Sequence, residues 1–160
     1  MSSTAQQSQI QPPVTELVVR DLDSSTTIFS VPFQRGPIPF GGRSTAITLQ
    51  SGDVWVVAST PLDQVTADKL TSKGPVKYII APDAEHTMYT GQYLQAFPDA
   101  KVYIPNRTAE QWAKDDAKKP FISRIAHTFG KGLGDPFATA TNGEIQTADW
   151  GAAHANEVRR

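Results

Sequence analysis

Between residues 54 and 104, short apolar runs alternate with segments in which apolar residues recur at helical spacing. Three runs predict strands: VWVVAS from Val54 to Ser59, VKYII from Val76 to Ile80, and KVYIP from Lys101 to Pro105. The middle run is apolar almost throughout, which is typical of a strand that is covered on both faces. This alternation of strands and helices predicts an α/β unit in which helices pack on a sheet.

The helices between these runs have recognisable starts and stops. The first is expected to be capped by Thr60, with Pro61 at its first position and Asp63 three residues after the cap, and to stop at Gly74-Pro75. The second is expected from about Met88 to Ala96, with an aromatic stripe that packs in the core: Tyr89, Tyr93 and Phe97. A third helix is expected from Thr108 to a point before Pro120 and carries Trp112.

Further strands are predicted before this unit. Val14–Val19 and Thr26–Phe33 are rich in β-branched residues, and a polar turn separates them. Thr45–Leu49 is expected to form a hairpin with the strand that begins at Val54. Gln34–Arg43 contains several glycines and prolines, and Phe129–Gly143 is rich in glycine and contains Pro136, so both are predicted to be loops.

Composition narrows the class of protein. The chain has 160 residues, which suits a single domain from residue 14 to residue 160 behind a Ser/Gln-rich disordered tail, Met1–Pro13. A net charge of -1 with scattered basic residues predicts no nucleic-acid partner. No apolar stretch approaches the roughly 20 residues of a membrane span. The chain has no cysteine, which excludes thiolate catalysis and cysteine-based zinc sites and favours a cytoplasmic location.

The segment that follows the strand ending at Ile80 carries the candidate chemistry. Asp83 and Glu85 are two residues apart, and His86 follows at the expected start of a helix. Carboxylates together with an imidazole can bind Zn²⁺ or another divalent metal. In an α/β unit, sites collect at the carboxyl ends of strands. The alternative is a polar loop in which a carboxylate caps the following helix.

Two stretches resemble the metallo-β-lactamase superfamily. GRSTAITLQSGDVWVVASTPL is similar to the family's opening hairpin, and GPVKYIIAPDAEHTMYTGQYLQAFPDAKVYIP is similar to the strand that carries its metal motif and to the helix and strand after it. The resemblance extends from about Thr26 to Gly151, and it is closest to an uncharacterised, diverged branch. It implies a mixed sheet with helices on one face, which is half of an αββα sandwich.

The motif of that family, His-x-His-x-Asp-His, is altered here. With His86 at the last position, Ala81 takes the place of the first histidine, Asp83 that of the second, and Glu85 that of the aspartate. Ser59 stands where the family's preceding strand often ends in aspartate. The resemblance therefore implies a degenerate metal site formed by Asp83, Glu85 and His86. Glu85 would be either a ligand or the general base, and we do not expect the family's two-zinc centre.

The family's domain consists of two similar halves, and the resemblance covers the first. The later ligands of the family have no clear counterpart, because Asp149 and His154 lie in a sequence that does not match its later motifs. We therefore expect either a truncated product or a chain that completes its sheet by association. An open sheet face would be a large apolar patch and would favour a homo-oligomer.

Three functions remain open from the sequence. The first is a metal-dependent hydrolase of an ester, thioester or lactone, which would take a small-molecule substrate and zinc or another divalent metal. The second is a non-catalytic α/β module that binds a small molecule or a partner. The third is a shortened gene product with little function of its own. His127 is expected to be structural, and Ser59 lacks the signature of a nucleophile.

Overall fold

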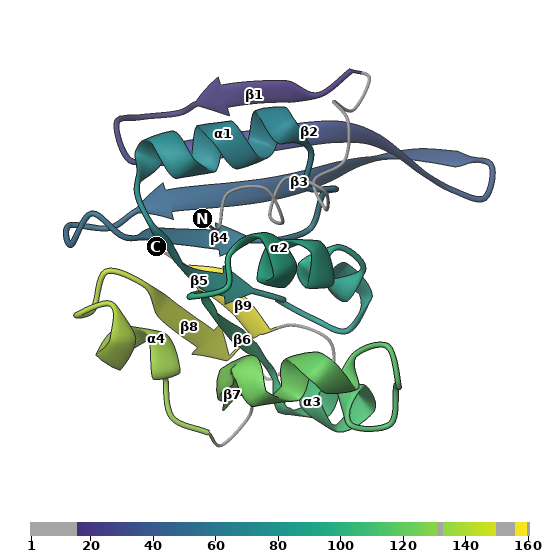
Figure 1. Cartoon of the computed structure of the whole chain (residues 1–160), viewed down its shortest axis with the longest axis vertical. Helices are drawn as coiled ribbons and strands as arrows, with labels where there is room; N and C mark the ends of the chain where they lie inside the picture. Colours follow the sequence, from purple (N-terminus) through teal and green to yellow (C-terminus); the bar gives the residue numbers. More distant parts are fainter. Residues whose placement is uncertain (1–15, 131–132, 150–155, 160) are drawn as a thin grey trace, which may run out of the picture.

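A seven-stranded mixed sheet forms the centre of the structure (Figure 1), a computed structural model that describes residues 16–130, 133–149 and 156–159. Its strands follow chain order: β1 (Val18–Asp21), β2 (Thr26–Arg35), β3 (Ile38–Thr48), β4 (Val54–Val57), β5 (Val76–Ile80), β6 (Lys101–Pro105) and β7 (Ile125–Phe129). Neighbours from β1 to β4 are antiparallel, and those from β4 to β7 are parallel. The predicted tail Met1–Pro13 lies outside the described residues.

Three helices cover one face of this sheet: α1 (Gln64–Lys73), α2 (Thr90–Ala96) and α3 (Asn106–Trp112). The core beneath them includes Phe29, Val56 and Ile79 from the strands. Tyr93 is fully buried in the same core, with Tyr89 and Phe97 partly buried against it, which confirms the predicted packing of the aromatic stripe. In the part of the chain that the structure describes, no helix has the length and apolarity to cross a membrane.

The opposite face of the sheet is packed against a short helix, α4 (Pro136–Ala140). The Phe137 ring lies 5.0 Å from that of Tyr103, 5.4 Å from that of Phe129 and 6.3 Å from that of Trp55, centroid to centroid. All four aromatic side chains are buried. A two-stranded sheet of β8 (Gln146–Asp149) and β9 (Asn156–Arg159) completes the described elements. Association through this face stays a prediction, and α4 reduces the apolar area available for it.

The expected loop at Gln34–Arg43 is wrong, because this segment is the outer part of the β2–β3 hairpin. Arg35 pairs with Ile38, so the turn consists of Gly36 and Pro37 alone. Gly36 has a φ of 60°, which glycine adopts without steric cost. The glycines and prolines on both sides of the turn were interpreted as the sign of a loop. They are tolerated in these strands because no third strand pairs with this part of the hairpin, so a missing N–H group leaves no partner unpaired. The paired residues 31–42 extend beyond the neighbouring strands (Figure 1), and we call them the arm.

The start of α1 also differs from the prediction. Asp63, rather than Thr60, is the N-cap, and its Oδ1 accepts a hydrogen bond of 2.8 Å from the Thr66 amide. Asp63 is fully buried, so this bond also satisfies a carboxylate that would otherwise be costly to bury. Gly74 ends the helix as expected, with a positive φ of 145°.

The predicted loop at Phe129–Gly143 contains α4, which the sequence pattern did not indicate. Asp135 caps this helix by accepting hydrogen bonds from the amides of Phe137 and Ala138, and Pro136 occupies its first turn. The helix has only five residues, too few to show an apolar period. The edge strand β7 was not predicted either. Its sequence, IAHTF, has no clear alternation of apolar and polar residues, and its side chains are mostly half-buried.

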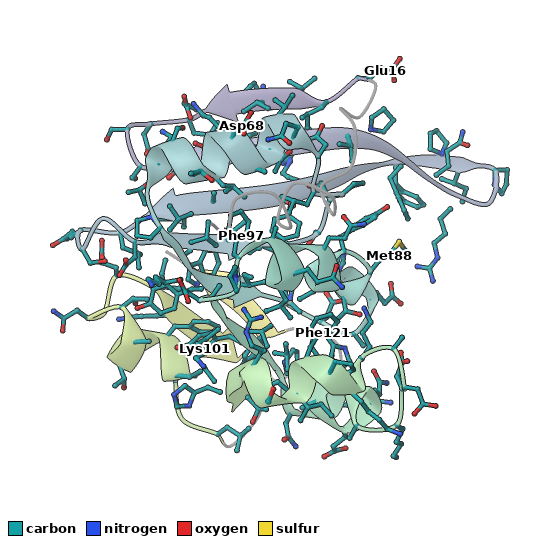
Figure 2. The ribbon with its side chains drawn as sticks, in the orientation of Figure 1. Glu16, Asp68, Met88, Phe97, Lys101 and Phe121 are labelled. Atoms are coloured by element: carbon teal, nitrogen blue, oxygen red, sulfur yellow. The ribbon has the colours of Figure 1, made fainter. Side chains whose placement is uncertain are left out.

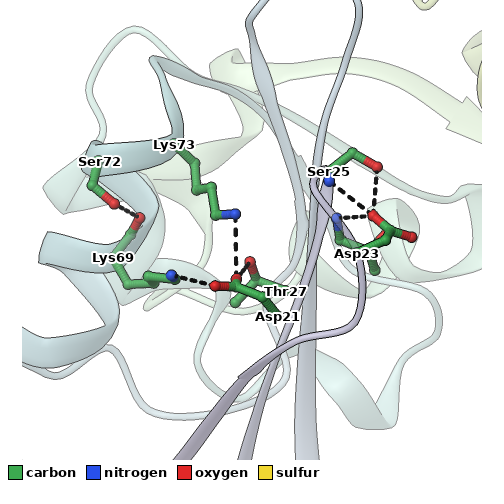
Figure 3. A network of polar contacts seen from close by, with 8 residues as sticks. Asp21, Asp23, Ser25, Thr27, Lys69, Ser72 and Lys73 are labelled. Atoms are coloured by element: carbon green, nitrogen blue, oxygen red, sulfur yellow. Dashed lines mark hydrogen bonds and ion pairs between the residues drawn. The ribbon is translucent and has the colours of Figure 1, made fainter.

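The edge strand β1 is tied to α1 by charged contacts (Figure 3). Lys69 Nζ lies 2.8 Å from Asp21 Oδ2, and Lys73 Nζ lies 3.2 Å from Asp21 Oδ1. Thr27 donates a further hydrogen bond of 2.6 Å to the same carboxylate. The hydrogen bond from Lys69, followed by that from Thr27, holds the pKa of Asp21 well below its usual range. This network fixes the helix over the antiparallel edge of the sheet.

Candidate functional site

The candidate site lies at the junction between β5 and α2. Because β4, β5 and β6 are parallel, their carboxyl ends meet at one edge of the sheet, where ligands bind in open α/β sheets. Ala81, the first residue after β5, is fully buried, and its amide donates a hydrogen bond of 3.1 Å to the Tyr103 carbonyl. The chain then turns outward into a short 3₁₀ helix, η2 (Glu85–Thr87), which leads into α2.

Asp83 organises this turn through both of its carboxylate oxygens. Oδ1 accepts hydrogen bonds from the amides of Glu85 (2.8 Å) and His86 (3.0 Å). Oδ2 lies 2.7 Å from Nδ1 of His86. The carboxylate therefore bonds the first two amides of η2 and orients the imidazole, whereas α2, the helix that the capping alternative concerned, has no side-chain cap. The side chains of Asp83 and His86 are 38% and 56% exposed, so solutes can reach both.

Glu85, the third residue of the predicted set, faces a different partner. Its Oε2 accepts a hydrogen bond of 3.1 Å from Nη1 of Arg35, at the turn of the arm. Both side chains are more than 70% exposed. The structure thus brings Asp83 and His86 together and holds the Glu85 carboxylate toward the arm. No group of three or more histidine, aspartate or glutamate side chains among the described residues could hold a metal ion in this arrangement.

The other positions named from the sequence do not add ligands to this group. Ala81 offers no donor side chain, and its burial leaves no space for a solvent-exposed one. The His127 ring lies 5.7 Å from that of Tyr103 (centroid to centroid), which agrees with the structural role expected for it. His154 lies outside the described residues, as does the side chain of Asp149.

A buried cluster of hydroxyl groups supports the same edge of the sheet and was not found from the sequence. Ser44 Oγ accepts hydrogen bonds from the amides of Ser59 (3.0 Å) and Thr60 (2.9 Å). It also lies 2.8 Å from the hydroxyl of Thr60 and 3.4 Å from that of Tyr93. Burial raises the pKa of the Tyr93 hydroxyl above its ordinary value. The cluster fixes the segment after β4 to β3 and α2, which explains why Thr60 is not a helix cap.

Arg35, the partner of Glu85, was also not identified from the sequence. It lies 50 residues from Glu85 in the chain, so no local pattern joins them. The only available signal was the Gly36-Pro37 pair as a hairpin turn, which would have placed Arg35 at the end of a projecting strand.

Solved structures provide the comparison for this arrangement. A metallo-β-lactamase from Erythrobacter litoralis matches 92% of this chain and 67% of its own, with a TM-score of 0.63 and 10% identity. A metallo-β-lactamase from Pontibacter korlensis matches 83% of this chain and 60% of its own, with a TM-score of 0.56 and 14% identity. The chain has a metallo-β-lactamase-like fold. FIM-1 from Pseudomonas aeruginosa, solved in a mono-zinc form, matches 94% of it with a TM-score of 0.59 and 10% identity.

The match is one of fold, since these identities are low. No protein-family model matches the sequence, and no curated protein matches it either. The chain spans 60–67% of the lengths of these three structures.

The donor atoms at the β5–α2 junction limit how many metal ions could bind there. A two-zinc centre does not fit, because Ala81 has no donor atom and Glu85 is drawn to Arg35. Asp83 and His86 offer one carboxylate and one imidazole, and their facing atoms, Oδ2 and Nδ1, are hydrogen-bonded to each other at 2.7 Å, so a cation would need a third ligand and a rearranged pair. Oxygen and imidazole donors suit Zn²⁺ and Mn²⁺.

Proposed function

We propose that this protein is a metallo-β-lactamase-like hydrolase that uses a single divalent cation at the β5–α2 junction. Asp83 and His86 would hold the cation, and Glu85 would be the third ligand or the general base. The substrate would be a small ester, thioester or lactone. The observation that carries this proposal is the adjacency of the Asp83 carboxylate and the His86 imidazole at the carboxyl end of β5, where a solute can reach both.

The residues of the chain have separable roles in this proposal. A divalent cation, if held by Asp83 and His86, would supply a water molecule of lowered pKa and would polarise the carbonyl of the substrate. Asp83 keeps the turn in place through the amides that bond to Oδ1, while Oδ2 faces the imidazole. Glu85, one residue before His86 in the chain, would be the third ligand or would accept a proton from the attacking water.

The experiment is a hydrolysis assay with Zn²⁺- or Mn²⁺-loaded protein on a panel of nitrophenyl esters, thioesters and lactones. We expect turnover that a chelator abolishes and that added metal restores. Asp83→Asn and His86→Gln should each abolish turnover, whereas His127→Gln is the matched control and should retain it. Turnover that survives both the chelator and His86→Gln would contradict the proposal.

A second candidate function is a non-catalytic binding module, as the sequence also allowed. The arm favours it, because Ile38 and Phe40 are 55% and 51% exposed on a hairpin that projects beyond the sheet. Light scattering across a range of protein concentrations separates the homo-oligomeric form of this candidate from a monomeric enzyme. An inactive protein that is also strictly monomeric would contradict that form. The cytoplasmic location and the homo-oligomer expected from the sequence stay predictions.

A further inference from the structure

The carboxyl-terminal end of α4 contains an asparagine in a left-handed conformation. Thr141 is the C-cap of this helix, and Asn142 after it has a φ of 56°. The amide of Gly143 then donates a hydrogen bond of 2.8 Å back to the Ala138 carbonyl. These are features of a Schellman motif, in which glycine is the usual left-handed residue and asparagine a less frequent one. Asn142 therefore has a backbone conformation that few side chains tolerate.

Asn142 combines this conformation with a sequence that favours reaction of its side chain. Asn142 and Gly143 are both exposed, and the Asn142 carboxamide makes no hydrogen bond to any described residue. Because glycine has no side chain, its nitrogen can approach the carboxamide carbon of the preceding residue without a steric clash. Figure 2 shows α4 on the side of the molecule opposite to Met88, which lies near the start of α2. The segment is therefore separate from the β5–α2 junction.

We propose that Asn142 is a site of spontaneous deamidation with water as the co-reactant. The Gly143 nitrogen loses its proton and attacks the side-chain carbonyl carbon of Asn142. A new C–N bond closes a succinimide ring, and the carboxamide nitrogen takes up a proton and leaves as ammonia. Water then opens the ring at either carbonyl. One opening gives aspartate, and the other gives isoaspartate, in which the main chain passes through the side-chain carbon.

The fold controls the rate of this reaction. In the closed end of the helix, the N–H that must lose its proton is donated to Ala138. The reaction therefore proceeds from molecules in which this end has opened. The opening is local, since α4 has only five residues, and local openings cost less free energy than global unfolding. The deamidation rate thus reports how often the end of α4 opens.

The products weaken the contacts that keep α4 on the sheet. Isoaspartate lengthens the main chain, so the Gly143 amide no longer lies opposite the Ala138 carbonyl. Both products also place a carboxylate at the carboxyl-terminal end of the helix, where negative charge is unfavourable. Phe137 on this helix is fully buried and packs against Tyr103 and Phe129. Deamidation should therefore loosen the cover of this aromatic face of the sheet.

The first experiment is incubation of the full chain in neutral buffer, followed by peptide mass spectrometry that separates aspartate from isoaspartate. The chain unfolded in urea gives the unprotected rate. We expect slower but measurable conversion of Asn142 in the folded chain. Asn106, which precedes Arg107 and donates a hydrogen bond of 3.1 Å to Glu110, is the internal control and should stay intact. A folded chain without product at Asn142, while the unfolded chain reacts to completion, would overturn the proposal.

A pair of variants tests the dependence on α4. Asp135→Ala removes the N-cap of this helix and should raise the rate at Asn142 by about 5-fold, the factor that corresponds to the loss of a typical N-cap. Asp68→Ala is the matched control, because Asp68 lies on α1 at a distance from α4 (Figure 2), and it should leave the rate unchanged. Equal rates in both variants would overturn the control of deamidation by opening of α4.

The second experiment measures hydrogen exchange in fresh and aged protein. The amides of residues 136–145 should exchange faster after isoaspartate has formed, whereas those of α3 should not change. Asn142→Gly adopts the left-handed conformation without a Cβ and cannot deamidate, so its exchange should be the same before and after ageing. Isoaspartate that forms at Asn142 without faster exchange of residues 136–145 would overturn the loosening of α4.

Discussion

Arg124 is expected to be one of the largest single contributors to the stability of the helical face. It lies at the end of η3 (Lys119–Arg124), and its guanidinium reaches the carboxyl-terminal end of α2. Nη1 donates to the Leu94 carbonyl (2.9 Å), and Nη2 donates to those of Phe97 (2.8 Å) and Ala100 (2.5 Å). Nε donates a fourth bond of 3.1 Å, again to Ala100. Leu94 lies in the last turn of α2 and Phe97 is its C-cap, where carbonyls lack helical partners and the dipole favours a cation, whereas Ala100 lies beyond the helix.

The magnitude follows from these four bonds. A hydrogen bond to a charged group contributes about 1.5–3 kcal/mol, so the sum sets an upper bound of roughly 6–12 kcal/mol. Arg124 is only half-buried, and water can reach the carbonyls that Arg124→Ala would release. We therefore expect a loss of about 2–4 kcal/mol in the free energy of unfolding, which corresponds to about 5–15 °C in Tm for a domain of this size. Arg124→Lys keeps the charge but not the planar fork, so about half of that loss is expected.

Urea denaturation followed by circular dichroism measures this loss. Arg107→Ala is the matched control, because Arg107 is exposed on α3 and makes no hydrogen bond or ion pair with the described residues. It should change the free energy of unfolding by less than about 0.5 kcal/mol. If Arg124→Ala is equally silent, the guanidinium is not a cap for these carbonyls and the reasoning is refuted.

Two further predictions concern pH. The lowered pKa of Asp21 stabilises the fold at pH values above the pKa of the unfolded chain, about 3.9, and this stabilisation is lost as the pH falls toward the pKa of the folded state. Asp21→Asn should therefore make Tm depend less on pH in the acid range. The raised pKa of the buried Tyr93 hydroxyl stabilises the fold below about pH 10, and this stabilisation is lost as the pH rises through the folded value. Tyr93→Phe should therefore remove part of the alkaline loss of Tm; an unchanged alkaline limb would refute this role.

The parallel half of the fold could be predicted from the sequence because its strands are continuous apolar runs. Val76–Ile80 and Lys101–Pro105 are confirmed as β5 and β6, and Gly74 ends the helix before β5 as expected. Such runs are covered on both faces, so their composition alone marks them. The error at Thr60 has a tertiary cause. Its hydroxyl is taken by Ser44, 16 residues away, which local capping rules cannot detect.

The candidate site was only half predictable for a similar reason. The turn that joins Asp83 to His86 is local, and the spacing of polar residues after Ile80 indicated it. The partner of Glu85 is not local, because the hairpin brings Arg35 across 50 residues of sequence. The glycines and prolines near the turn predicted a loop, so neither the two strands nor the position of the Arg35 guanidinium could be predicted.

The central claim is that a divalent cation binds the imidazole of His86. The chain has three histidines, so nitrogen-detected NMR of the imidazole side chains during a Zn²⁺ titration offers two internal controls, His127 and His154. The account predicts that the ring nitrogens of His86 shift with saturating, one-to-one behaviour, and that Asp83→Asn abolishes the shift. A shift confined to His127 or His154, or none at a Zn²⁺ concentration well above that of the protein, would contradict it.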